Sequence, residues 1–330
     1  MIDPVLNLID RTGAAAPWIL LLLFVDSSAL ILWRLEAMSR KGIEGTVLGT
    51  LVMPYCTGIG NLIFVGVMVR HYGAGAEVMT NCLVNNATNL TLLIGLPTIF
   101  WGMSVLPAGK AKRKELQEHR VNRLSLSLTI TAALFFSCCV WALGLDGKLG
   151  RGDGIALIAL FLFWQCMQVV EVMKLNVLKS QSLPERLWLD FLILLVSGFV
   201  MAVSLEGLVN WLASIEEGFF SAGRLGWLSG WLLVLPNAAM AMWYGWKRKP
   251  DVVYSSQVGD GHICIPLCLG VFAVFQEMPM PKGFAVSMGI VVGAAAAHLA
   301  CVVIAGRLTK PMGGVLIVAY IYFLCAGLIE

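Results

Sequence analysis

Four asparagines occupy the stretch TNCLVNNATNLT, residues 80–91, inside a run otherwise apolar enough to cross a membrane. An amide group in hydrocarbon is costly unless it bonds to another polar group or to a bound ligand. Asn81, Asn85 and Asn89 are spaced four apart, so on a helix they form one stripe that faces one neighbour. The stripe indicates either hydrogen bonds between helices or the lining of a cation path.

A second polar stripe follows at a constant sequence offset of 175, and it contains a carboxylate. The correspondence of the two stripes pairs Asn81 with Ser256, Asn85 with Asp260, Asn89 with Cys264, and Gly95 with Gly270. An ionisable residue within a membrane segment predicts a functional site. Asp260 is therefore the residue most expected to hold an ion.

Two further asparagines lie upstream of the stripes, at an offset of 176. CTGIGNL at residues 56–62 contains Asn61, and LVLPNAA at residues 233–239 contains Asn237. The glycines of the first stretch and the proline of the second predict interruptions of these two helices. Tyr55 is an alternative to Asn61, since LVMPY at residues 51–55 also resembles LVLPN, but the spacing to Gly95 favours Asn61.

The stretch DGHIC, residues 260–264, offers a different chemistry. Asp260, His262 and Cys264 together could hold a transition metal. On an intact helix, however, His262 points about 200° away from the other two side chains. We therefore favour a hard cation held by amide and carboxylate oxygens.

The elements that must position these residues are membrane helices. The chain has 330 residues, of which 58% are apolar and 13% charged, and this composition is typical of a polytopic membrane protein. Apolar runs predict ten segments, at residues 17–33, 43–69, 78–103, 124–145, 154–173, 187–211, 225–246, 252–276, 283–306 and 314–329. No polar gap is long enough for a soluble domain.

The charged loops predict the orientation. Most of the 23 Lys and Arg residues fall in loops after odd-numbered segments, which places those loops inside and both termini outside, on the periplasmic side of a bacterial inner membrane. This bias explains the net charge of +3 without a nucleic-acid partner. The nine cysteines lie in or near apolar segments and form no zinc-type pair, so neither a disulfide framework nor a cofactor is expected.

The two stripes divide the chain into related halves. Five segments per half is an odd number, so the second half must be inverted relative to the first, as in many secondary transporters. We predict an N-terminal five-helix repeat at residues 1–176 with its motif at 56–96, a cytoplasmic connecting loop at 177–186, and an inverted C-terminal repeat at 187–330 with its motif at 233–271.

The motifs resemble the two alpha repeats of the sodium/calcium exchanger superfamily of cation antiporters. The resemblance implies an all-α fold of ten helices and alternating access, in which the first and sixth segments rock against the core. It implies cation ligands at these positions: Thr57, Asn61, Asn85, Asn89, Asn237, Ser256, Asp260 and Cys264.

The departure from the family pattern lies in its two acidic positions. Asn61 and Asn237 stand where the resemblance implies the calcium-binding acids. A divalent cation beside Asp260 alone would leave net positive charge in a low-dielectric interior. Three alternatives remain at this point: a monovalent ion, a second acid from Asp26, or a softer metal held by the Cys264 thiolate.

The sequence therefore predicts an antiporter with an altered site for sodium, protons, calcium or another divalent cation. The alternative is a non-transporting membrane subunit or scaffold, for which a membrane partner is expected. An intramembrane enzyme using Asp260 and His262 would need a nucleophile that the spacing does not supply, so we predict no enzymatic activity. The expected partners are the lipid bilayer and inorganic cations.

Overall fold

The computed structural model describes residues 5–7, 9, 11–40, 53–104, 113–177 and 187–328. The elements are almost all helical, and the predicted fold class is confirmed. The first half contains η1 (Gly13–Ala15), α2 (Ala16–Arg40), α4 (Met53–Val67), η3 (Met68–Tyr72), α5 (Gly75–Ala87), η4 (Thr88–Leu92), α6 (Leu93–Trp101), β1 (Met103–Ser104), α7 (Arg113–Leu143), η5 (Gly144–Asp146), β2 (Lys148–Leu149) and α8 (Arg151–Val177).

The second half repeats this order of elements. It contains α9 (Leu187–Ala213), η6 (Ala222–Arg224), α10 (Leu225–Trp246), α11 (Pro250–His262), η7 (Ile263–Cys268), α12 (Leu269–Phe275), β3 (Met278–Pro279), α13 (Phe284–Ala300), η8 (Cys301–Ala305), β4 (Arg307–Leu308) and α14 (Lys310–Leu328). Within the described residues, nine helices are long and apolar enough to span a membrane. The remaining predicted segment, the second in chain order at residues 43–69, corresponds to α4, and its first ten residues lie outside the described ranges.

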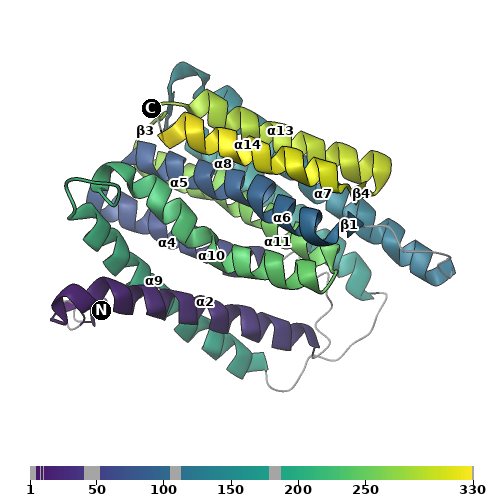
Figure 1. The fold of residues 1–330 in the computed structure, drawn as a ribbon, viewed down its shortest axis with the longest axis horizontal. Coiled ribbons are helices and arrows are strands. Elements are labelled where there is room, and N and C mark those ends of the chain that lie inside the picture. Colours follow the sequence, from purple (N-terminus) through teal and green to yellow (C-terminus); the bar gives the residue numbers. More distant parts are fainter. Residues whose placement is uncertain are drawn as a thin grey trace.

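The helices pack in pairs that repeat across the two halves. α5 packs on α10 while α4 packs on α11 and η7, and α6 packs on α14 while α8 packs on α12. Figure 1 shows α2 and α9 along one edge of the bundle, α13 and α14 along the opposite edge, and α4, α5, α10 and α11 between them. The helices that carry the predicted site therefore form the centre.

Close glycine contacts mark the repeated crossings. A Cβ atom built at Gly95 would lie 3.1 Å from the Gly313 carbonyl oxygen, and one built at Gly154 would lie 2.7 Å from the Gly270 carbonyl oxygen. Because glycine has no Cβ, the two backbones can meet at each crossing. The first contact joins α6 to α14, and the second joins α12 to α8.

The predicted interruptions of the second and seventh segments are wrong. α4 continues through Gly58 and Gly60, and α10 continues through Pro236. A Cβ atom at Gly60 would lie 2.7 Å from Leu233 Cδ2, and one at Gly58 would lie 3.0 Å from the Ile263 side chain. These glycines therefore allow close helix packing rather than breaking their helix.

The interruptions occur instead in the third and eighth segments. η4 and η7 are π-helical turns that begin at Thr88 and Ile263, and these two positions are related by the same offset of 175 as the two polar stripes. A π turn leaves the regular ladder of backbone hydrogen bonds and re-aims the side chains around it. Both stripes therefore pass through an interrupted helix.

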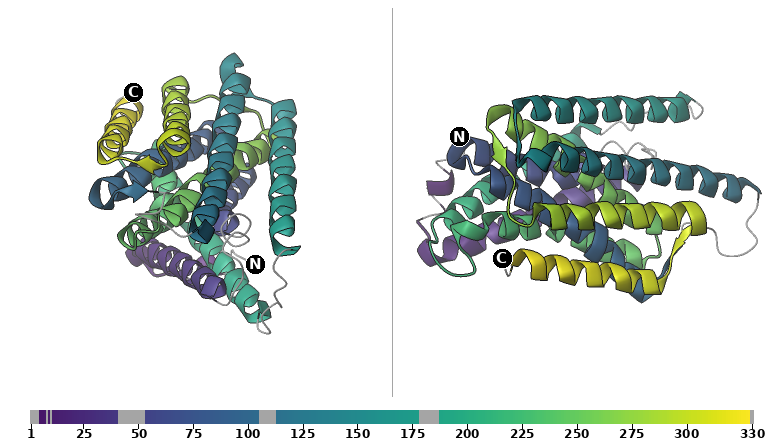
Figure 2. Two further views of the ribbon diagram at one scale, coloured as in Figure 1. Left: turned by 90° about the vertical axis from the view of Figure 1, so that its right-hand side faces the viewer. Right: turned by 90° about the horizontal axis from the view of Figure 1, so that it is seen from above.

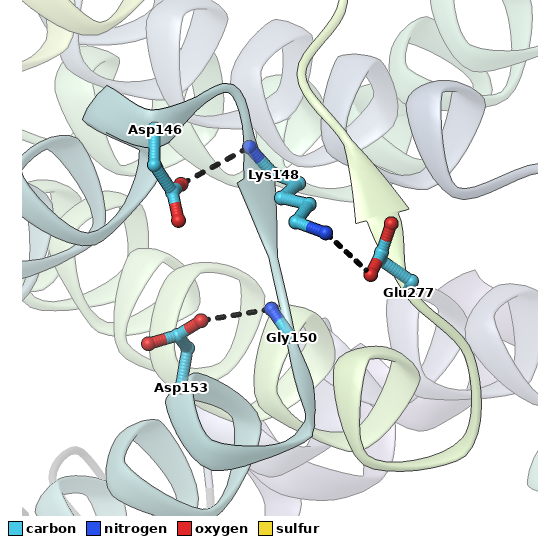
Figure 3. A network of polar contacts seen from close by, with 5 residues as sticks. All are labelled: Asp146, Lys148, Gly150, Asp153 and Glu277. Carbon is cyan, nitrogen blue, oxygen red and sulfur yellow. Dashed lines mark hydrogen bonds and ion pairs between the residues drawn. The ribbon is translucent and has the colours of Figure 1, made fainter.

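Two short antiparallel ribbons close the ends of the bundle. β1 pairs with β4, and β2 pairs with β3. Figure 3 shows the second ribbon, where Lys148 Nζ lies 2.9 Å from Glu277 Oε2 and the Asp153 carboxylate accepts the Gly150 N–H at 2.8 Å. The hydrogen bond and the charge of Glu277 raise the pKa of Lys148 above its ordinary value. This exposed ion pair joins the start of α8 to the end of α12.

Candidate cation site

The polar stripes meet at the centre of the bundle. Five predicted ligands from five helical segments are fully buried there: Asn61 of α4, Asn85 of α5, Asn89 of η4, Asn237 of α10 and Asp260 of α11. Pairing of α5 with α10 and of α4 with α11 brings these segments together. A single arrangement of helices thus gathers residues from both halves of the chain.

Asp260 is the acceptor at the middle of this group. Its Oδ2 atom accepts a hydrogen bond from Asn89 Nδ2 at 2.9 Å and another from Asn237 Nδ2 at 3.1 Å. Both donors are neutral amides, so the carboxylate has hydrogen-bond partners but no positive charge beside it among the described residues. A buried, uncompensated carboxylate favours the binding of a cation.

The amides form a chain that leads from Asp260 to α4. Asn89 Nδ2 also donates to Asn85 Oδ1 at 2.8 Å, and Asn85 Nδ2 donates to Asn61 Oδ1 at 3.3 Å. Asn237 Nδ2 lies 3.4 Å from Asn89 Oδ1. The five side chains are therefore one connected network, and a change at one end can reach Asp260.

Several buried oxygens around this network accept no hydrogen bond from a described residue. They are Asp260 Oδ1, Asn237 Oδ1, Gln257 Oε1 and Asn81 Oδ1, while Asn61 Nδ2 is the one amide nitrogen in this position. Buried polar atoms normally have partners, because leaving one unpaired costs free energy. An excess of unpaired acceptors over donors is the pattern expected around a cation.

Two further predicted ligands, Ser256 and Cys264, lie at the border of the network. The Ser256 hydroxyl donates to the Val253 carbonyl at 3.0 Å, and Gln257 connects it to Asn237. Cys264 Sγ lies 3.9 Å from Asp260 Oδ2, which is a weak contact. The side chains of Thr57 and Tyr55 lie outside the described residues.

Two proposed reinforcements of the site do not reach it. Asp26 is exposed on α2, on the side of that helix opposite to the buried Phe24 and Ser28. The ring of His262 faces α7, where its Nε2 lies 2.9 Å from the Thr129 carbonyl oxygen. η7 begins only after His262, so the π turn does not bring this ring to Asp260.

The alternative of a softer metal at the Cys264 thiolate finds no ligand cluster among the described residues. The Cys82 thiol contacts the thiols of Cys264 and Cys268 beside the network. In the part of the chain that the structure describes, no group of three or more His, Cys, Asp or Glu side chains is arranged to hold a metal ion. The three cysteines are buried and pack as small core residues.

Gln257 is a part of the network that the sequence analysis missed. Its Nε2 donates to the Asn237 carbonyl at 3.2 Å and to Ser256 Oγ at 3.0 Å, and its side chain is fully buried. At the offset of 175 that relates the two stripes, Gln257 corresponds to Cys82. Because Cys82 carries no amide, the comparison of the two stripes does not point to Gln257. Its position beside Ser256 within an apolar segment was the one available signal.

Comparison with known proteins supports the resemblance. Residues 15–170 match the sequence model of the family described as sodium/calcium exchanger protein. Comparison with curated protein sequences gives no match.

Solved structures of the sodium-calcium exchanger NCX_Mj are similar to nearly the whole chain. The structure soaked with 2.5 mM Na+ and 10 mM Sr2+ is 18% identical, covers 94% of this chain and 96% of that chain, and has a TM-score of 0.66. The structure soaked with 100 mM Na+ and 10 mM Sr2+ is 17% identical, covers 99% of both chains and has a TM-score of 0.65. At this level of identity, the likeness establishes the fold.

Two comparisons agree with the helix order, the paired crossings and the two interrupted helices. The first is the family match in the first half of the chain, and the second is the fold match along nearly the whole chain. The resemblance to the sodium/calcium exchanger superfamily is thereby confirmed: residues 15–170 match that family, and the chain as a whole has the exchanger fold.

Proposed function

We propose that the protein is a cation antiporter in which Asp260 provides the fixed charge of the site, and that the transported ion is monovalent. The family and the fold support a cation antiporter, and a transporter rather than an enzyme. The observation that carries the proposal is the surplus of unpaired buried oxygens beside a fully buried carboxylate with neutral partners.

The charge balance favours a monovalent ion. One carboxylate neutralises one positive charge, whereas a divalent ion would leave a net charge of +1 in the protein interior. Such an uncompensated buried charge costs several kcal/mol. Asp26 faces away, and Cys264 makes only a distant contact, so neither supplies the missing charge.

The asparagines supply neutral oxygens. In this structure Asn89 and Asn237 direct their NH2 groups at Asp260. Rotation of a terminal amide by half a turn exchanges its NH2 for its carbonyl oxygen. A bound cation would therefore exchange amide donors for oxygen ligands without movement of the helices.

The approach to the site supports alternating access. A pocket between the α2–α9 pair and the central helices is lined by Phe24, Ser28, Met201, Gly60 and Pro236. Gly60 and Pro236 directly precede the ligands Asn61 and Asn237. Movement of α2 and α9 against α4 and α10 would open or close this pocket, while the ligands stay in place.

The repeat boundaries and the orientation belong to the same proposal. The repeats comprise residues 1–176 and 187–330, with the connecting loop 177–186 in the cytoplasm and both termini outside a bacterial inner membrane. The paired packing of α5 with α10 and of α4 with α11 supports this division.

The test is ion flux in proteoliposomes under imposed gradients of sodium, potassium, protons, calcium and manganese. Asp260→Asn should lower monovalent flux about 100-fold or more, since the site loses its counter-charge. Asp251→Asn, at an exposed position of the same helix, is the matched control and should leave flux unchanged.

Absence of flux for every cation would favour the scaffold alternative, for which the loss of both family acids is the supporting observation. Flux of calcium or manganese by the wild-type protein at rates equal to those of monovalent ions would contradict the charge argument.

A further inference from the structure

A carboxylate lies on the outer face of α2, deep within the membrane span. The span that contains it covers Gly13–Arg34, 22 residues, and Asp26 is exposed. At 1.5 Å per residue, Asp26 lies roughly 4 Å from the middle of this span. An aspartate side chain is too short to carry its charge from that depth to the interface.

The surroundings of Asp26 on α2 are apolar. Trp18, Leu22, Val25 and Trp33 are exposed, as is the small Ala29, and their spacing of three and four places them with Asp26 on one face. The opposite face, with Leu20, Phe24 and Ile31, is buried. In the left view of Figure 2, α2 lies at the lower edge of the bundle, with α9 beside it.

The Asp26 carboxylate has no interaction partner in the described part of the chain. No described residue forms an ion pair or a hydrogen bond with Asp26. Charged residues in membrane segments almost always face the bundle interior or pair with another group, because a lone charge in hydrocarbon is costly. This face of α2 therefore lacks the partner that a charged residue at this depth of the membrane normally has.

We propose that this face binds a transmembrane helix of a different protein, one that carries a basic residue at mid-depth to pair with Asp26. Charge complementarity selects such a partner, and Ala29, one turn from Asp26, allows close approach of a second helix. The inference goes beyond the proposed transport function, because Asp26 does not face the cation site.

A second copy of this chain fits less well. A symmetric contact through α2 would bring Asp26 against Asp26, which is repulsive. Of the lysines and arginines that the structure describes, the exposed ones lie at the ends of spans or in loops, so a second copy offers no basic side chain at the required depth. The partner must therefore supply it.

A designed peptide can test this surface. The full chain in lipid nanodiscs would be titrated with a leucine-based transmembrane peptide bearing one central lysine, and with the same peptide bearing a central leucine. Energy transfer between labels reports binding. The lysine peptide should bind about tenfold more tightly or better, and Asp26→Leu should abolish the difference while Asp251→Leu should preserve it.

The thermal stability of Asp26→Leu separates a surface role from a folding role. The variant should unfold at the same temperature as the wild type or higher, because it removes an unpaired charge from lipid. Equal binding of the two peptides, or an Asp26-dependent homodimer, would overturn the proposal. Loss of folding in Asp26→Leu would also overturn it, since Asp26 would then be needed by this chain alone.

Discussion

The third and eighth membrane segments, α5–η4–α6 and α11–η7–α12, have matching backbones but different chemistry. Their π turns start at positions related by the offset of 175, and the predicted ligands Asn85 and Asp260 have the same separation. One repeat offers a neutral amide where the other offers a carboxylate. The comparison teaches that the helix geometry is duplicated while the charge is present in only one copy.

The two π turns are also produced differently. η7 contains Pro266, which has no N–H and so cannot complete the helical ladder. η4 has no proline, and His298 Nε2 from α13 lies 2.7 Å from its Leu90 carbonyl oxygen. In the eighth segment, a proline in the local sequence interrupts the helix. In the third segment, a histidine from a neighbouring helix contacts a backbone carbonyl of the π turn.

Moving the charge between the repeats would test the comparison most severely. The double variant Asn85→Asp, Asp260→Asn should recover monovalent flux to within about tenfold of wild type, whereas Asp260→Asn alone loses it. The reason is that Asn89 Nδ2 contacts both positions, at 2.8 Å and 2.9 Å. Proteoliposome flux measures the recovery. Failure of the double variant, if it folds, would show that the two positions are not equivalent.

Adding a charge should change the ion. Asn85→Asp alone gives two carboxylates around Asn89, so calcium or manganese flux should appear and monovalent flux should fall about tenfold. Asn86→Asp is the control, because Asn86 donates to the Cys82 carbonyl rather than to this network. Divalent flux in both variants would mean that the position of the charge is unimportant.

The glycine crossings should differ in their tolerance of a side chain. A Cβ at Gly154 would lie 2.7 Å from the Gly270 oxygen and 2.8 Å from the Val274 nitrogen, both backbone atoms. Gly154→Ala should therefore cost about 2 kcal/mol of stability. Gly95→Ala, with its contact at 3.1 Å, should cost less. Thermal unfolding followed with a thiol-reactive dye compares them, and a reversed order would contradict the crossing geometry.

Removal of His298, which contacts η4, should lower the stability by an amount comparable to or smaller than that of Gly154→Ala. His298→Ala leaves the buried Leu90 carbonyl without its partner and should destabilise the protein by about 1–3 kcal/mol. Tyr254→Phe removes only the longer contact to His298 Nδ1, at 3.4 Å, and serves as the control. Hydrogen exchange at residues 88–92 should increase in the first variant alone. If hydrogen exchange at residues 88–92 were the same in both variants, contacts other than the one from His298 would support η4.

The smallest effect is expected at the β2–β3 ribbon. Glu277 raises the pKa of Lys148, so the pair contributes its stability fully below the ordinary pKa of lysine and loses it as the pH rises through the raised value. Lys148→Gln should lower the unfolding temperature slightly at neutral pH and not at strongly alkaline pH. Lys282→Gln, at another exposed position, should show no such pH dependence.

Much of the architecture was readable from the residues. The apolar runs predicted the membrane segments because each helix must cover the hydrocarbon thickness. The offset of 175 predicted which residues correspond, and the start of η4 and η7 at that offset agrees with it. The spacing and the family resemblance together named five central side chains, and their role as cation ligands stays a prediction: Asn61, Asn85, Asn89, Asn237 and Asp260.

The tertiary structure decided what single segments could not. Glycine and proline were expected to interrupt the second and seventh helices, but side chains of neighbouring helices fill the space at Gly58 and Gly60, and the interruptions lie elsewhere. Only the packing placed Gln257 in the network and turned Asp26 and His262 away from it.

The sequence by itself therefore determined which segments can span a membrane, which residues correspond between the two polar stripes, and that one carboxylate remains among the central polar residues. Those features depend on length, hydrophobicity and residue type along the chain. The tertiary structure alone decided which polar atoms are paired and which face of α2 is exposed, because hydrogen bonds and burial depend on atoms from helices far apart in the sequence.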